Sequence, residues 1–154
     1  MNSLLLKLNT KIANWESSGI GHNTLSTQDI ISAIPNTISG QLLSYVAQER
    51  IPDRKLIAVI KSKCIKRYNL QITRKTRYYP NTKRLDSVDL NKLVHMAITE
   101  IITETKYTKK QFAIELCEKE TTAYNNFFPI YQDFICLIND GLYRARRKFQ
   151  HNIG

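Results

Sequence analysis

The chain has 154 residues, of which 42% are hydrophobic and 23% are charged, and this balance excludes a chain that is disordered throughout. Five glycines and four prolines are few, which favours helices over a turn-rich β-sandwich. The formal net charge of +10 is unusual, and it informs about partners and not about fold. We therefore expect one all-α domain over residues 1–154, with residues 1–50 as a candidate N-terminal subdomain.

The three cysteines carry no metal or redox motif. Cys64, Cys117 and Cys136 lie far apart in apolar stretches, and no CxxC pair exists. We expect buried thiols in a reducing cytoplasm, with no bound metal or other cofactor. The N-terminal run MNSLLLKLNTK is too short for a signal peptide or a membrane span, so a cytoplasmic location without membrane contact is predicted.

The first half of the chain alternates apolar helical stripes with helix breakers. Helices are predicted over residues 3–16, over 27–34, where Pro35 must end the helix, and over about 38–49. Ser26 and Asp29 resemble a capping box at the second of these helices. A fourth helix is predicted over about 53–68, and its apolar side comprises Leu56, Ile57, Ile60, Cys64 and Tyr68.

Residues 70–85 differ from the helical segments around them. Their β-branched residues partly alternate with polar ones, and Pro80–Asn81 is a turn signal. The pattern predicts a short ribbon or an ordered basic loop, and periodicity does not distinguish the two.

The second half of the chain predicts further helices. Asp86 can cap a helix that reaches about Thr105, and Thr108 with Gln111 forms a capping box for a helix over about 109–117. Another helix begins at Thr121 or Thr122, Pro129 interrupts or kinks it, and a last helix covers about 130–149. The chain thus has six to eight helices and a basic central connector.

A block of positive charge spans this connector. Residues 50–84 contain 12 of the 23 Lys and Arg residues against one acid, Asp53, and the cations are interleaved with Tyr68, Tyr78 and Tyr79. Polyanions are the usual partner of such a surface, although most charge runs are merely solvated faces. Tyrosine rings can also stack on unpaired bases. The predicted phosphate contacts are Lys63, Lys66, Arg67, Arg74, Lys75, Arg77, Lys83 and Arg84, with those from Arg74 onward expected on non-helical backbone.

The segment after Thr108 has the pattern of a helix-turn-helix. Phe112, Ala113 and Leu116 would face a second helix that starts near Thr121, and Cys117 is a small residue at the turn. Glu118 and the absence of a turn glycine depart from that pattern, and short helical hairpins also occur in ordinary bundles. If the hairpin reads DNA, its base contacts are Thr121, Thr122, Asn125 and Asn126.

Catalytic patterns are weak. The histidines are isolated, and no serine–histidine–acid or cysteine–histidine set can be assembled. Glu100 and Glu104 are four residues apart and could share a metal ion, but a solvated helix face is the better interpretation with Lys106 nearby. We expect a protein that is not an enzyme.

The order of features from Leu90 onward resembles the C-terminal part of bacteriophage late-gene antitermination proteins of the Q type. The similarity covers about 60 residues: the helix LNKLVHMA from Leu90, the hairpin helix FAIEL from Phe112, and then Tyr124, Phe127, Pro129, Ile130 and Tyr131 before a last amphipathic helix with Leu142 and Ala145. Several such proteins carry a cysteine-rich zinc knuckle where this chain has only residues 101–107. The resemblance implies DNA binding near a late promoter and contact with RNA polymerase.

These observations predict a DNA-binding transcription regulator, with a phage-type antiterminator as its narrower form. The alternative is an RNA- or ribonucleoprotein-binding inhibitor that uses the basic block without sequence readout. A nuclease would need an acidic metal-binding cluster, which the sequence does not supply.

Overall fold

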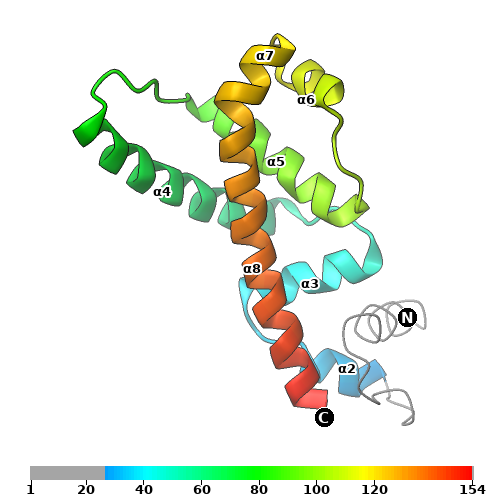
Figure 1. Cartoon of the computed structure of the whole chain (residues 1–154). Coiled ribbons are helices and arrows are strands. Elements are labelled where there is room, and N and C mark those ends of the chain that lie inside the picture. Colours follow the sequence, from blue (N-terminus) through cyan, green and yellow to red (C-terminus); the bar gives the residue numbers. More distant parts are fainter. Residues whose placement is uncertain (1–26, 154) are drawn as a thin grey trace. The chain divides into compact units, whose positions relative to one another are not determined.

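The computed structural model describes residues 27–153, and the prediction of an all-α protein is confirmed for them (Figure 1). The helices predicted to start before residue 27, with the Ser26 cap, lie outside these residues. The elements in chain order are α2 (Thr27–Ala33), α3 (Ile38–Gln48), α4 (Arg54–Tyr78), α5 (Ser87–Thr103), α6 (Lys109–Leu116), α7 (Glu120–Thr122), the π-helical turn η2 (Ala123–Phe127) and α8 (Phe128–Ile153). No strand occurs between residues 27 and 153.

The described chain forms two compact units. The first contains residues 27–52 and 139–153, and the second contains residues 53–138. Helix α8 therefore contributes its first part to the second unit and its last part to the first.

Side-chain caps start three helices of the second unit, α4, α5 and α6, at the predicted positions. The Asp53 carboxylate accepts a bond from the Leu56 N–H at 2.8 Å, and Asp86 accepts one from Asp89 at 2.8 Å. The predicted capping box is confirmed, since Thr108 and Gln111 each accept the other's backbone N–H at 3.2 Å. These bonds satisfy N–H groups that a helix leaves unpaired in its first turn.

Helix α4 ends ten residues later than the sequence pattern indicated, at Tyr78 instead of 68. The interpretation of residues 70–78 as ribbon or loop is therefore wrong. Ile72 extends the buried stripe of Leu56, Ile60, Cys64 and Tyr68 by one more step of four residues. The Thr73 hydroxyl donates a hydrogen bond to the Asn69 carbonyl, and the Thr76 hydroxyl donates one to the Thr73 carbonyl. Packing thus overrides the weak helix propensity of these β-branched residues.

Pro129 does not separate the helix that begins at Glu120 from the last helix. The chain is helical from Glu120 to Ile153, and the π turn Ala123–Phe127 immediately precedes the proline. In that turn the N–H of Phe128 reaches back to the Ala123 carbonyl. A wider turn relieves the clash that the proline ring would make in a regular helix.

Three helices end in the left-handed region without a glycine. Glu49, Glu104 and Cys117 have φ of 54°, 55° and 54°. Helix α5 therefore ends at Thr103, before the predicted Thr105, and Glu104 does not share a helix face with Glu100. Cys117 and Cys136 are exposed and only Cys64 is buried, so the prediction of three buried thiols is wrong for two of them.

The interior of the second unit is apolar and partly aromatic. Leu93, Val94 and Ala97 of α5 are fully buried. The ring of Phe112 in α6 lies 5.0 Å from that of Tyr131 and 5.4 Å from that of Phe128, both in α8. This packing fixes α6 against the start of the last helix and so positions the hairpin.

Candidate nucleic-acid interface

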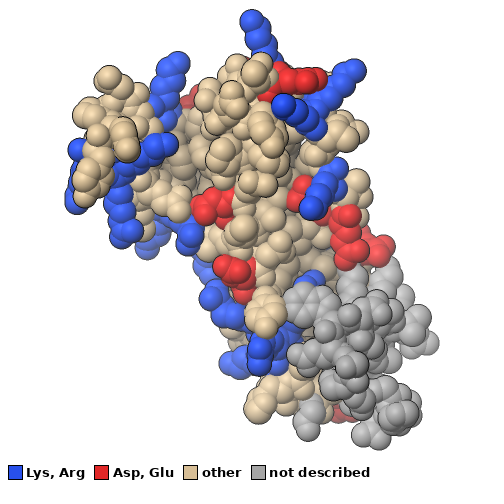
Figure 2. Space-filling model, in the orientation of Figure 1, with Lys and Arg blue, Asp and Glu red and all other residues tan. Residues whose placement is uncertain are grey.

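Helix α4 concentrates the positive charge of the chain. Its 25 residues contain nine Lys and Arg and no acid, and the only carboxylate at its start is the Asp53 cap. A single narrow stripe of α4 is buried, so the cations lie on its remaining surface. Figure 2 shows Lys and Arg side chains along this helix.

Six of the eight predicted phosphate contacts lie on α4, and the other two lie in the loop that follows. All eight are exposed: Lys63, Lys66, Arg67, Arg74, Lys75, Arg77, Lys83 and Arg84. The prediction that residues from Arg74 onward lie on non-helical backbone is correct for Lys83 and Arg84 and wrong for the other three. Arg54, Lys55 and Lys61 are on the same helix and were not among the predicted contacts, although the charge run already pointed to them.

One of the eight predicted phosphate contacts, Arg67, already forms an ion pair within the protein. The Arg67 Nε lies 3.3 Å from the Asp133 carboxylate of α8, with side-chain exposures of 48% and 28%. This pair links α4 to α8 within the second unit. In the described part of the chain no ion pair occupies Arg74, Lys75 or Arg77, so the C-terminal part of α4 is better suited to an anionic ligand.

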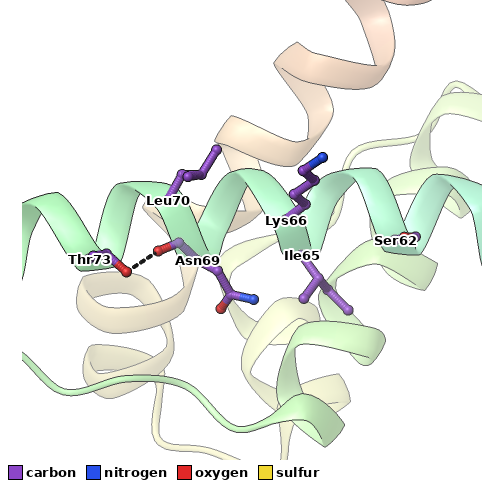
Figure 3. A pocket seen from close by; sticks show the side chains of 6 residues that line it. All are labelled: Ser62, Ile65, Lys66, Asn69, Leu70 and Thr73. Atoms are coloured by element: carbon purple, nitrogen blue, oxygen red, sulfur yellow. Dashed lines mark hydrogen bonds between the residues drawn. The ribbon is translucent and has the colours of Figure 1, made fainter.

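A shallow open hollow lies along the exposed side of α4. It measures about 440 Å³ and is lined by Ser62, Ile65, Lys66, Asn69, Leu70 and Thr73. In Figure 3, Lys66 and Leu70 form one rim, and Ile65 and Asn69 point to the other side. The Thr73 hydroxyl donates to the Asn69 carbonyl at 2.7 Å. The hollow therefore presents a lysine and a side-chain amide between apolar side chains.

A second hollow, of about 490 Å³, lies at the end of α4. Its lining comprises Lys75, Tyr78, Tyr79, Pro80, Asn81 and Thr82. The two tyrosines are 81% and 67% exposed, which is unusual for such large rings. Backbone bonds fix the turn, because Tyr79 N–H donates to Lys75 O at 2.8 Å and Thr82 N–H to Tyr79 O at 3.1 Å.

The hairpin of α6 and α7 is present, but its second helix is not a separate recognition helix. It starts at Glu120 and continues through η2 into α8. Of the predicted base contacts, Thr121, Asn125 and Asn126 are exposed and Thr122 is half-buried. Thr121 and Asn125 are four residues apart, as are Thr122 and Asn126, so the set lies on one side of the helix.

The surroundings of the hairpin are electrically mixed. Glu118 and Glu120 are exposed close to the proposed base contacts. The Lys109 ammonium lies 4.4 Å from the centre of the Tyr124 ring, and this ring stacks on Phe128 at 4.8 Å. The field at the hairpin is therefore less favourable to a polyanion than the field along α4.

No group of three or more metal-ligating side chains occurs among the residues that the structure describes. None of the described helices is both long and apolar enough to cross a membrane.

Comparison of the chain with protein families, with curated proteins and with solved structures gave no match. The resemblance to phage antitermination proteins therefore rests on the residues quoted above.

Proposed function

We propose that this protein binds duplex DNA through α4 and acts as a transcription regulator. The observation that carries the proposal is the nine cations and no acid on one 25-residue helix whose surface is mostly exposed. At 1.5 Å per residue the helix is about 37 Å long, close to one turn of B-DNA. A helix fits the major groove, and cations along its flanks can reach the phosphates on both edges.

Sequence readout is proposed for neutral polar residues at two places, a set on the hairpin and one asparagine on α4. Thr121, Thr122, Asn125 and Asn126 form the set on the hairpin, and Asn69 lies among the cations of α4. An asparagine side chain can pair with adenine in a bidentate manner. Selection from random duplex and single-stranded pools would compare Asn126→Ala with Asn69→Ala. The variant that loses sequence preference identifies the reading element, and hairpin readout is wrong if Asn126→Ala keeps the wild-type preference.

The salt dependence of duplex binding tests the proposal itself. If about six phosphates are neutralised, the logarithm of the affinity should fall with the logarithm of salt concentration with a slope of about −5. Replacing Arg74 and Arg77 by Gln should reduce that slope by about 2, because each cation releases about one counterion.

A matched control removes the same charge elsewhere. Lys92→Gln with Lys106→Gln also removes two exposed cations of the second unit, but neither residue lies on α4. This pair should leave the slope nearly unchanged. Equal losses in the two double variants would mean that net charge and not α4 determines binding.

The narrower function, a phage-type antiterminator acting with RNA polymerase, is supported by the resemblance alone. Transcription of a template with a terminator downstream of the selected DNA site tests it. Read-through that requires both the protein and its site would support antitermination, and unchanged termination would argue against it.

A further inference from the structure

We propose that the end of α4 carries a stacking site for unpaired nucleobases, formed by Tyr78 and Tyr79. This rests on the proposed function and specifies its ligand: DNA or RNA with a short single-stranded stretch. The site is the 490 Å³ hollow where α4 turns into the loop at Pro80.

The rings of Tyr78 and Tyr79 are exposed to solvent, and the backbone turn that carries them is held by hydrogen bonds. Tyr78 and Tyr79 are 81% and 67% exposed, whereas Tyr68 on the same helix is 4% exposed. Tyr78 is the last residue of α4, and Tyr79 caps the helix by donating to Lys75. The Tyr79 carbonyl accepts bonds from both the N–H and the hydroxyl of Thr82, at 3.1 and 2.8 Å. Two large rings are thus presented to solvent on a hydrogen-bonded turn, so the backbone that carries them is already ordered before a flat ligand stacks on them.

Charge identifies the class of ligand. Arg74, Lys75, Arg77, Lys83 and Arg84 surround the tyrosines in sequence, and no acid occurs between Arg54 and Leu85. An apolar protein surface docked on the rings would have to cover some of these cations without neutralising them. A nucleotide supplies both an aromatic face for the ring and a phosphate for the cation.

Unlike a duplex-binding surface, this stacking site requires an unpaired base in its ligand. In a duplex the base faces are covered by their neighbours, and only edges and phosphates are accessible. Tyrosine rings can stack only where a base is unpaired, at a single strand, a bulge or a melted segment. The cations of α4 would then hold the backbone while the tyrosines take the bases.

The test compares ligands that have the same phosphates with and without bases. The full chain is titrated with an oligothymidine of about 12 nucleotides, with an abasic strand of equal length, and with an oligouridine RNA of equal length. The wild type should prefer the base-bearing strands by roughly fivefold or more, because stacking of even one base contributes that much. Similar affinity for thymidine and uridine strands would show that either nucleic acid supplies the ligand, and a preference between them would identify its source.

Two variants determine whether the tyrosines cause the preference. Tyr78→Ala with Tyr79→Ala should lower affinity for the base-bearing strands to that for the abasic strand and leave duplex affinity unchanged. Tyr78→Phe with Tyr79→Phe keeps both ring faces and should keep the preference. Circular dichroism of each variant confirms that the helices are retained.

The failure of this site is distinguishable from the failure of the proposed function. Equal wild-type affinity for base-bearing and abasic strands, with salt-dependent duplex binding intact, overturns the stacking site alone. Absence of binding to every strand and duplex at low salt overturns both. If the alanine variant changes self-association in sedimentation but not base preference, the rings belong to a protein interface and the stacking site is wrong.

Discussion

The Tyr68 hydroxyl accepts a hydrogen bond from the backbone N–H of Leu85 at 2.8 Å, across 17 residues of sequence. Tyr68 belongs to the buried stripe of α4, and Leu85 lies at the end of the loop that carries Lys83 and Arg84. This single bond ties the loop back to the helix that precedes it. It therefore helps to determine where two of the proposed phosphate contacts lie.

Replacing Tyr68 by Phe should loosen this loop. The variant keeps the buried ring and removes the acceptor, so it should lose about 1 kcal/mol of local stability. Limited trypsin digestion followed by mass spectrometry should show cleavage after Lys83 and Arg84 about fivefold faster than in the wild type.

Tyr78→Phe is the matched control for the loop prediction. It removes a hydroxyl from an exposed ring on the same helix. Cleavage after Lys83 and Arg84 should not change in this variant. Equal rates in the wild type and in Tyr68→Phe would mean that the bond does not restrain the loop.

Replacement by glycine at two exposed cysteines should change the free energy of unfolding in opposite directions. Cys117 ends α6 with φ 54°, a conformation that costs a residue with a Cβ about 1 kcal/mol or more. Cys117→Gly should therefore raise the free energy of unfolding by about 1 kcal/mol. Cys136 lies inside α8, where Cys136→Gly should lower it by a similar amount.

Chemical denaturation of the two glycine variants measures both changes. A loss of stability in Cys117→Gly would show that the thiol makes a stabilising contact that outweighs the backbone strain. Such a result would not change the prediction that Cys136→Gly lowers the free energy of unfolding.

Local signals predicted much of the fold and only part of the candidate site. The caps at Asp86 and Thr108 were correctly predicted because capping depends on residues within one turn. The continuation of α4 was not predicted, although Ile72 extends the four-residue spacing of the buried stripe and could have signalled it. The bond from Leu85 to Tyr68 and the ordered turn at Tyr79 depend on tertiary packing, which no short window of sequence contains.

Thiol labelling should distinguish Cys64 from the other two cysteines. Burial, and then the nearby Asp133 carboxylate, raise the pKa of the Cys64 thiol to about 12. Because the thiolate is the reactive form, Cys64 should stay unlabelled by a maleimide at pH 8 while Cys117 and Cys136 react. Mass spectrometry should show two adducts on the native chain and three in denaturant, and a rapid third adduct under native conditions would contradict the burial of Cys64.

The same thiol should make stability depend on pH. Its pKa is higher in the folded chain than the ordinary value of 9.0, so the unfolded chain loses the proton first as pH rises. The contribution of Cys64 is therefore complete below pH 9 and is lost between about pH 9 and 12. Unfolding of Cys64→Ala over this range should lack that component of the decrease.

Tyr131 should tolerate the loss of its hydroxyl. The side chain is 2% exposed, and among the described residues its hydroxyl has no hydrogen-bond partner of good geometry. Burial, followed by the carboxylate of Glu100, raises the pKa of Tyr131 above its ordinary value of 10.0. Tyr131→Phe removes a buried polar atom, so thermal unfolding at pH 7 should occur at the same temperature or higher.

The pH dependence of this variant gives a second measurement. The neutral phenol is favoured in the folded chain, so wild-type stability should fall as pH rises above about 10, where the unfolded tyrosine ionises. Tyr131→Phe should lose stability less steeply over that range. A lower melting temperature for the variant at pH 7 would show that the hydroxyl donates to Glu100 in solution.

Two glycines of the first unit should differ in how they tolerate a methyl group. A Cβ on Gly40 would lie well inside contact distance of the Pro35 carbonyl oxygen, and one on Gly141 would meet the Ser39 hydroxyl. Backbone cannot move aside as a side chain can, so Gly40→Ala should be destabilised by about 1–3 kcal/mol. Gly141→Ala should lose less, since the Ser39 hydroxyl can rotate away.

A double-mutant cycle tests the cause of the Gly141 effect. Ser39→Ala removes the oxygen that the new methyl group would meet, so Gly141→Ala should be less destabilising in that background than in the wild type. No equivalent rescue exists for Gly40→Ala, because its obstacle is the backbone between Pro35 and Asn36. If Ser39→Ala leaves the cost of Gly141→Ala unchanged, the close approach at Ser39 is not what requires a glycine there.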